Sequence, residues 1–360
     1  TITGNPTITE LNNIAAKTTG VVTATLAADS LSNLGDLTTA GTDAITITVN
    51  DADAAAVTAS DLSTLGGKTA GTVTVTNAVA ITGSAAELTA ALVTAGSLVE
   101  VTDATATVSD ADGTGITATA LSAIGAKTTG TVTVTNAVAI TGSASELTAA
   151  LVTAGSLVEV SDATATINDA DGTGITATAL SAIGGATTGT VTVTNAIAIT
   201  GSPSEVTAAL VTAGSLVDVT DATVTITGNP TITELNNIAA KTTGVVTATL
   251  AADSLSNLGA LSTAGTDAIT ITVNDADAAG VTASDLSTLG GKTAGTVTVT
   301  NAVAITGSAS ELTAALVTAS TLVEVSDATA TVSDADGTAI TAAALSAIGA
   351  KTTGTVTVTN

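Results

Sequence analysis

Eight amino-acid types are missing from this chain of 360 residues: cysteine, methionine, histidine, phenylalanine, tyrosine, tryptophan, arginine and glutamine. Without cysteine, no disulfide framework can staple the fold. Without aromatic side chains a wide globular core is hard to fill, whereas a narrow core between stacked repeats needs only Val, Ile, Leu and Ala. Histidine and cysteine supply much of the acid–base and nucleophilic chemistry of enzymes, and arginine often stabilises developing negative charge. We therefore expect no catalytic residue and no enzyme.

Positive charge is also scarce, because 31 acidic residues face only 6 lysines, for a net charge of −25. Nucleic-acid binding needs a basic footprint against phosphates, so no nucleic-acid partner is expected. No apolar run approaches the roughly 18 residues of a membrane span. We also expect no small-molecule substrate, while an acidic surface keeps copies soluble and attracts cations.

The sequence consists of many similar copies of one segment, of which Ser84 to Asp103 (SAAELTAALVTAGSLVEVTD) is typical. Ser84 and Glu87 have the spacing of a capping box, which predicts a helix start. The apolar residues after them fall on one helical face until Ala95-Gly96 ends the helix. A period-two strand follows, with Val99 and Val101 on one face and Glu100 on the other. A helix and a strand this short are not stable alone, so each copy must bury its apolar face on its neighbours.

Two periods organise the copies. TVTVTN begins at Thr72, Thr131 and Thr190, an even spacing that contains two helix–strand copies and that we call the two-copy repeat. On a longer scale, positions 1–136 recur as 225–360 with nine substitutions. We therefore expect a single continuous repeat array over 1–360, with one long repeat at 1–224 and an incomplete second copy at 225–360. Because Thr1 falls inside a repeat, we expect the array to be an excerpt of a longer chain.

The fold predicted from this pattern is mainly β: a right-handed parallel β-solenoid of about thirteen coils, each with two short strands and a short helix. At ~4.8 Å between stacked strands, thirteen coils would measure about 60 Å. An antiparallel array of hairpins is the alternative. The absence of two-residue Asn-Gly or Asp-Gly turns between alternating strands argues against it.

Paired aspartates form the candidate metal sites. Carboxylates two residues apart on a tight loop can both reach one hard cation, and Ca²⁺ takes oxygen ligands from such loops. The remaining ligands of an EF-hand loop are missing, so an acidic turn with a purely structural role is the alternative. The candidate weak calcium sites, and the only cofactor candidates, are Asp51, Asp53, Asp110, Asp112, Asp169, Asp171, Asp275, Asp277, Asp334 and Asp336.

Threonine rows are the other candidate surface. TVTVT places Thr72, Thr74 and Thr76 on the outside of a coil, and flat threonine rows are a feature of ice-binding solenoids. Alignment of the copies puts Glu100 opposite Thr74. We therefore predict that threonine and acidic rungs alternate, which would interrupt a neutral hydroxyl lattice. Each lysine follows a helix, where a cation suits the negative end of the helix dipole.

The iterated TVTVTNAVAITGSAAELTAALVTAG and ATVSDADGTGITATALSAIGAKTTG resemble the repeat arrays of giant Ala/Thr/Val/Gly/Asp-rich surface proteins of bacteria, especially of the cyanobacterial type. The resemblance covers the whole chain and concerns composition and repeat style. It implies export to the cell surface and a structural role in an extracellular filament, sheath or surface layer that self-associates. The alternatives are a rigid spacer of a calcium-dependent adhesin and, more remotely, an ice-binding solenoid.

Overall fold

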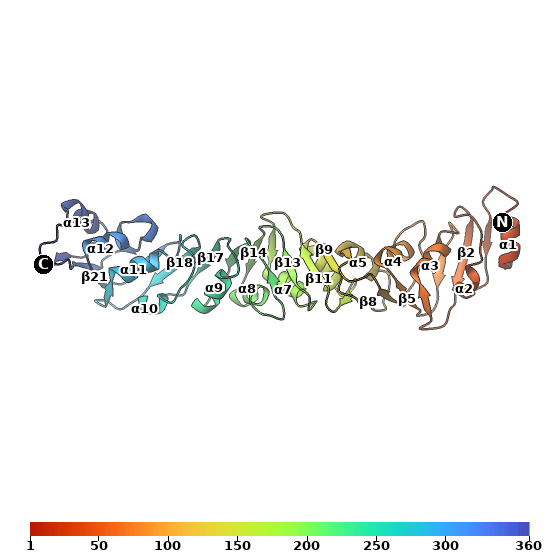
Figure 1. The fold of residues 1–360 in the computed structure, drawn as a ribbon, viewed down its shortest axis with the longest axis horizontal. Coiled ribbons are helices and arrows are strands. Elements are labelled where there is room, and N and C mark those ends of the chain that lie inside the picture. The colour runs from red at the N-terminus through yellow and green to blue at the C-terminus, as the bar shows by residue number, and fades with distance from the viewer. Residues whose placement is uncertain (360) are drawn as a thin grey trace. The chain divides into compact units, whose positions relative to one another are not determined.

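The computed structural model describes residues 1–359, in which short helices alternate with short parallel strands (Figure 1). The helices are α1 (Ile8–Ala15), α2 (Leu31–Leu34), α3 (Ala59–Gly66), α4 (Ala85–Leu92), α5 (Ala118–Gly125), α6 (Ala144–Leu151), α7 (Ala177–Gly184), α8 (Pro203–Leu210), α9 (Ile232–Ala239), α10 (Leu255–Leu258), α11 (Ala283–Gly290), α12 (Ala309–Leu316), η1 (Ala319–Thr321) and α13 (Ala342–Gly349). Most of them have eight residues, whereas α2 and α10 have four.

The strands have two to six residues each. They are β1 (Thr23–Thr25), β2 (Ala44–Val49), β3 (Ala56–Thr58), β4 (Val73–Val75), β5 (Ala80–Gly83), β6 (Thr105–Val108), β7 (Gly115–Thr117), β8 (Val132–Val134), β9 (Ala139–Gly142), β10 (Val158–Val160), β11 (Thr164–Ile167), β12 (Gly174–Thr176), β13 (Val191–Val193), β14 (Ala198–Gly201), β15 (Val217–Asp218), β16 (Thr223–Ile226), β17 (Val246–Thr249), β18 (Ala268–Val273), β19 (Gly280–Thr282), β20 (Val297–Val299), β21 (Ala304–Gly307), β22 (Glu324–Val325), β23 (Thr329–Val332) and β24 (Val356–Val358).

The chain divides into two compact units. The first contains Thr1–Asp169 and Ala182–Thr194, and the second contains Ala170–Ser181 and the described residues from Asn195 onward. In the first unit the sheet orders are β1-β2-β4, β10-β8-β6-β5-β3 and β13-β11-β9-β7. In the second they are β12-β14-β16-β17-β18-β20-β22 and β19-β21-β23-β24. The division does not fall between the copies of the long repeat.

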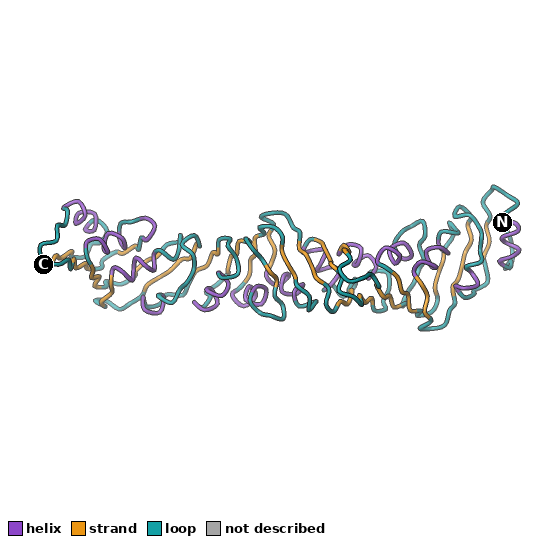
Figure 2. The backbone as a smooth tube through the Cα atoms, in the orientation of Figure 1, coloured by secondary structure: helices purple, strands orange, loops and turns teal. Residues whose placement is uncertain are grey.

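Strands of successive helix–strand copies lie side by side and run parallel, as the neighbouring orange segments of Figure 2 illustrate. Ile81 pairs with Ala106, and Ala106 pairs with Val132. All three side chains are at most 2% exposed. Because side chains alternate across a strand, this register stacks one buried residue on the next and builds a narrow aliphatic core.

The predicted parallel strands and interspersed helices are confirmed, but the prediction of a mainly β chain is wrong. Helix accounts for 28% of the residues and strand for 25%. The strand predicted around Val99 and Val101 is reduced to an isolated bridge, at which Glu100 pairs with Thr74. Two strands separate most neighbouring helices, as predicted, although only one follows α1 or α9 and three follow α6.

The helices begin where the capping boxes predict. The Ser84 hydroxyl accepts from the Glu87 amide, and the Glu87 carboxylate accepts from the Ser84 amide at 2.8 Å. The helix ends at Leu92, however, before the predicted stop at Gly96, because the Val93 amide closes the last turn on the Thr89 carbonyl and the chain then turns away. Equivalent capping boxes start α1, α6, α8, α9 and α12.

The Asp-x-Asp turns bend through a left-handed residue. Gly113, Gly172 and Gly337 have φ between 74° and 79°, a conformation that glycine adopts without strain. Ala54 and Ala278 occupy the same place in the two turns that lack glycine, with φ of 60° and 61°. The backbone of the turn is therefore set by its position in the repeat, even where alanine must adopt a less favourable conformation.

Candidate functional site

The first aspartate of each Asp-x-Asp pair binds the start of a helix that precedes it in the chain. Asp110 follows β6 and accepts from the Ala85 amide at 2.6 Å. Ala85 is the first residue of α4, whose amide has no partner within the helix. The same bond joins Asp51 to α2, Asp169 to α6, Asp275 to α10 and Asp334 to α12.

The second aspartate of the pair binds in the opposite direction along the chain. Asp112 accepts from the amide of Ala137, which comes later in the sequence, at 3.0 Å. Asp53, Asp171 and Asp277 accept from the equivalent amides at 3.0 to 3.1 Å. The equivalent residue after Asp336 would lie beyond Asn360, outside the described chain. One Asp-x-Asp turn therefore connects three successive helix–strand copies. We call this turn the aspartate clamp.

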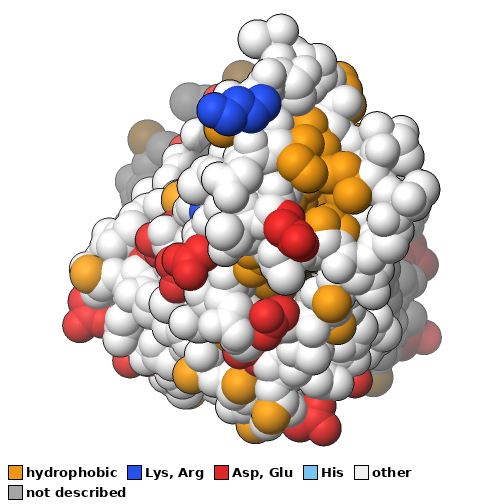
Figure 3. All heavy atoms as spheres, turned by 90° about the vertical axis from the view of Figure 1, so that its right-hand side faces the viewer, with side chains coloured by type: hydrophobic (Ala, Val, Ile, Leu, Met, Phe, Trp, Pro, Cys, Tyr) orange, Lys and Arg blue, Asp and Glu red, His pale blue; other side chains and the backbone are white. Residues whose placement is uncertain are grey.

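The clamp gives nine of the ten candidate calcium ligands a structural role, because each of the nine accepts from a backbone amide of another helix–strand copy. Within residues 1–359, no group of three or more Asp, Glu, His or Cys side chains is arranged to hold a metal ion. Figure 3 likewise shows acidic side chains spread over the visible face. Calcium binding at these turns remains a prediction, and it has to compete with the amide bonds.

Two substitutions separate the clamp from a calcium site. We expect Asp110→Ala to weaken α4 by about 1–2 kcal/mol, because the amide of Ala85 loses its acceptor. Asp110→Asn should have a much smaller effect, because its amide oxygen still accepts. Hydrogen exchange of α4, followed in calcium and in EDTA, measures both. Equal exchange in Asp110→Asn and Asp110→Ala, with protection that depends on calcium, would contradict the clamp.

A second cross-repeat contact, which the sequence analysis missed, lies in the Thr-x-Gly that precedes many strands. The Thr128 hydroxyl donates to the Ala104 carbonyl and accepts from the Gly130 amide at 3.0 Å. Thr69 does the same in its repeat and is only 5% exposed. Thr187, Thr242, Thr293 and Thr352 repeat the contact. The regular recurrence of Thr-x-Gly in the sequence was the signal for it.

The glycine of this motif permits close backbone approach. A Cβ on Gly130 would lie 2.3 Å from the Ala104 carbonyl oxygen, and Gly71, Gly189, Gly244, Gly295 and Gly354 meet equivalent oxygens at 2.3 to 2.4 Å. None of these glycines has a positive φ. Glycine is therefore needed at these positions because a Cβ would clash with the neighbouring backbone, and not because of the backbone conformation. We call each Thr–Gly pair a threonine–glycine lock.

Two buried carboxylates were also missed by the sequence analysis. Asp43 is 5% exposed and accepts from the amides of Val22 and Ala40 at 2.8 and 3.0 Å. Asp267 is 4% exposed and makes the equivalent bonds. A buried carboxylate is stable when backbone amides satisfy it, so these residues hold repeats together.

The capping-box glutamates make the stability of the fold depend on pH. The Ser84 amide, and then its hydroxyl, hold the pKa of the Glu87 carboxyl below its ordinary value of 4.5. The pKa values of Glu10, Glu146, Glu205, Glu234 and Glu311 are lowered in the same way. A lowered folded pKa means that the stabilisation is complete above the unfolded value of about 4.5 and is lost as the pH falls through the folded value.

We therefore expect the melting temperature, followed by circular dichroism, to fall as the pH drops below about 4.5. Replacing all six glutamates with glutamine should make this fall shallower, because the amide oxygen accepts at every pH. Hydrogen exchange resolves the helices α5 and α13, whose threonine caps lack an acidic partner and which therefore serve as controls. An unchanged pH profile in the six-fold variant would show that the boxes do not contribute.

The threonine rows follow the predicted register but not the predicted alternation. Thr74 lies opposite Glu100, as predicted, and Thr133 lies opposite Glu159. On the other side of Thr133, however, the row continues through three more threonines, Thr107, Thr82 and Thr58. The alternation was wrong because β8 pairs with β6, so that strands of different types within the two-copy repeat stack on one another.

Two lysines bind a helix other than the one they follow. The Lys68 Nζ donates to the carbonyl of Gly35, the C-cap of α2, at 2.6 Å, and Lys292 makes the same bond to Gly259 after α10. These two lysines therefore bind a helix C-terminus, as predicted, but the helix belongs to a preceding helix–strand copy.

Comparisons with known proteins identify no relative: no family model, no curated protein and no solved structure matches this chain. No helix among residues 1–359 has the length and apolar character that a membrane span requires.

Proposed function

We propose that the chain is a right-handed parallel β-solenoid of about thirteen coils that serves as a structural element of an extracellular filament, sheath or surface layer. The observation that supports the proposal is the recurrence of the same cross-repeat bonds. The clamp at Asp110 recurs at Asp169, and the lock at Gly130 recurs at Gly189. Chemistry that repeats with the sequence suits a mechanical role better than a single reactive centre.

The proposed mechanism is mechanical. Each added repeat brings its own clamp, its own lock and another layer of Val, Ile, Leu and Ala, so the stability of an array grows with the number of repeats. The net charge of −25 keeps isolated arrays apart, and divalent cations between neighbouring arrays would screen that repulsion. Self-association is therefore proposed to depend on ionic conditions.

Negative-stain electron microscopy of the purified chain, with millimolar calcium or with EDTA, tests the proposal. We expect elongated particles in both conditions and lateral bundles in calcium. Particles that are elongated only in calcium would favour the spacer of a calcium-dependent adhesin. Compact particles in both conditions would contradict a structural filament.

Ice binding is a second candidate, favoured by one observation. Thr58, Thr82, Thr107 and Thr133 occupy four successive in-register positions before Glu159, and Thr117, Thr141, Thr166 and Thr192 form a second row of four threonines. Thermal hysteresis of the chain, compared with a Thr82→Lys/Thr107→Lys variant, tests it. A freezing-point gap that the variant abolishes would support ice binding, and no gap would remove it.

A further inference from the structure

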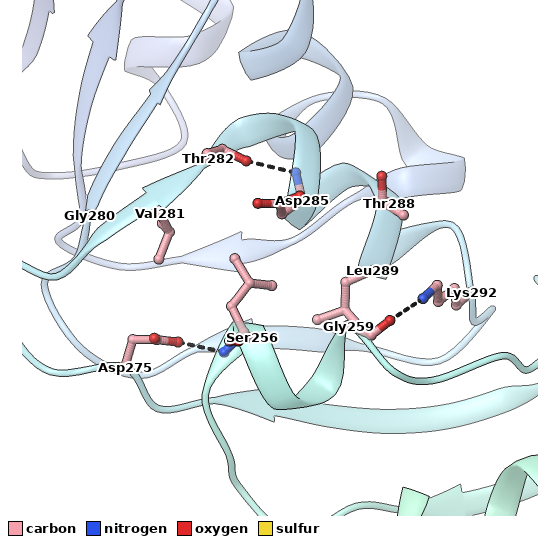
Figure 4. A pocket seen from close by; sticks show the side chains of 11 residues that line it. Ser256, Gly259, Asp275, Gly280, Val281, Thr282, Asp285, Thr288, Leu289 and Lys292 are labelled. Atoms are coloured by element: carbon pink, nitrogen blue, oxygen red, sulfur yellow. Dashed lines mark hydrogen bonds between the residues drawn. The ribbon is translucent and has the colours of Figure 1, made fainter. Parts of the chain in front are cut away.

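One pocket occurs in each copy of the long repeat, at equivalent residues of the two copies. Its volume is about 430 Å³ beside α2 and about 370 Å³ beside α10. The second is shown in Figure 4, where Val281 and Leu289 point into the space between α10 and α11. Both volumes lie in the range of small-ligand pockets, roughly 300–1,000 Å³.

The pocket exists because one helix is short. The helix α10 has four residues and ends at Leu258, whereas most helices of the chain have eight. The missing turns leave part of α11 uncovered. Leu255, Val281 and Leu289, each at most 7% exposed, form an apolar floor there. The four-residue helix has the same sequence, LSNL, in both copies, so the pocket is a regular feature of the long repeat.

Polar groups of both charges surround this floor. One oxygen of Asp275 accepts from the Leu255 amide at 2.7 Å, and the Lys292 Nζ donates to the Gly259 carbonyl at 2.7 Å (Figure 4). The carboxylate of Asp285 makes no hydrogen bond to any residue in the described chain, although its amide binds Thr282. The ammonium of Lys292 has two further N–H donors. In the pocket beside α2, one oxygen of the equivalent Asp61 carboxylate accepts from the Thr58 hydroxyl at 2.8 Å, which leaves its other oxygen as an acceptor. Both pockets thus offer further acceptors and donors.

We propose that each pocket binds a neutral pyranose sugar. A hydroxyl group both donates and accepts, so one sugar ring can donate to Asp275 and Asp285 and accept from Lys292, while its C–H face covers the floor. An anionic ligand would meet two carboxylates and a chain of net charge −25, whereas the hydroxyl groups of a neutral ring suit both the carboxylates and Lys292. The hydroxyls of Ser256 and Thr288 add to the polar rim.

The chain has no aromatic residue to stack on a sugar, so each pocket binds weakly. Weak sites that recur along a repeat array gain avidity when their ligands belong to one polymer. The pockets would therefore distinguish a polysaccharide, which engages several copies, from a free monosaccharide, which engages one.

Saturation-transfer NMR on the intact chain tests the site, with methyl glucopyranoside, glucuronate and leucine as probes at millimolar concentration. We expect transfer from protein methyl groups to the ring protons of the neutral glycoside and none to the other two. Transfer only to leucine or glucuronate, or to none of the three, would overturn the proposal. A polyglucose such as dextran should bind more tightly than the glycoside, since it can engage both pockets.

Variants locate the binding. Asp61→Ala with Asp285→Ala removes one acceptor from each pocket and should weaken binding about tenfold. Ser32→Phe with Ser256→Phe fills both pockets without removing a charge and should abolish binding. The control, Glu100→Ala with Glu324→Ala, removes two exposed carboxylates outside the pockets and should bind as the parent does. Binding that survives the filled variant would place the sugar elsewhere and overturn the assignment.

Discussion

Gly130→Ala is expected to destabilise the chain by about 3 kcal/mol or more, a large effect for a single methyl group. The added Cβ would lie 2.3 Å from the Ala104 carbonyl oxygen and 2.7 Å from the Asp103 oxygen. Both are backbone atoms in the preceding repeat. Because a backbone cannot rotate away as a side chain can, relief requires the two repeats to separate. That separation would also break the bond from Thr128 to Ala104.

The matched control is Gly155→Ala. A Cβ on Gly155 would have no heavy atom within 4 Å, and the residue has no positive φ, so alanine fits there without strain. This change should be neutral or slightly stabilising, by about 0.5 kcal/mol. Thermal unfolding followed by circular dichroism compares the two, since the chain has no tryptophan or tyrosine for fluorescence. Equal melting temperatures for Gly130→Ala and Gly155→Ala would show that the backbone contact at Gly130 leaves room for a Cβ.

A charge in the core should have a still larger effect. Val99 is 1% exposed, and its amide donates to the Ala91 carbonyl at 2.7 Å, which ties the chain back to α4. Val99→Asp would place a carboxylate there without a partner, at a cost of about 4 kcal/mol or more. We expect local unfolding of the surrounding repeats, visible as rapid hydrogen exchange in α4 and β6.

The adjacent residue supplies the control for this change. Glu100 is exposed and forms an isolated bridge with Thr74. Glu100→Lys reverses a charge on the outward face and should shift stability by less than about 0.5 kcal/mol. Similar exchange rates for Val99→Asp and Glu100→Lys would mean that the inward position of Val99 and the outward position of Glu100 are assigned wrongly.

The parts of the fold predicted from the sequence are those that depend on near neighbours. The capping box of Ser84 and Glu87 joins two residues within one helical turn, and its geometry is contained in that spacing. The register of Thr74 on Glu100 was also predicted, because both lie in copies of the same motif. The additional strand β7 was missed, since Gly115–Thr117 is short and begins with glycine, which disfavours a strand.

What the sequence could not provide was the partner of each strand. Whether β8 lies beside β6 or elsewhere depends on the path of the intervening chain through a turn, a helix and another turn. The same limit applies to the candidate site. The acidic pairs were found from their spacing, but the amides that Asp110 and Asp112 bind belong to two other repeats. A local pattern identified the residues, and only the stacking revealed their partners.

Stacking of the repeats into a parallel solenoid can be tested through the dimensions of the chain when its length is doubled. Small-angle X-ray scattering would compare the 360-residue chain with a tandem fusion of two copies. For a solenoid, we expect the maximum dimension to double while the radius of gyration of the cross-section stays constant. A compact fold would instead grow in all directions, with an overall radius of gyration only about 1.3 times larger, and that result would contradict the solenoid.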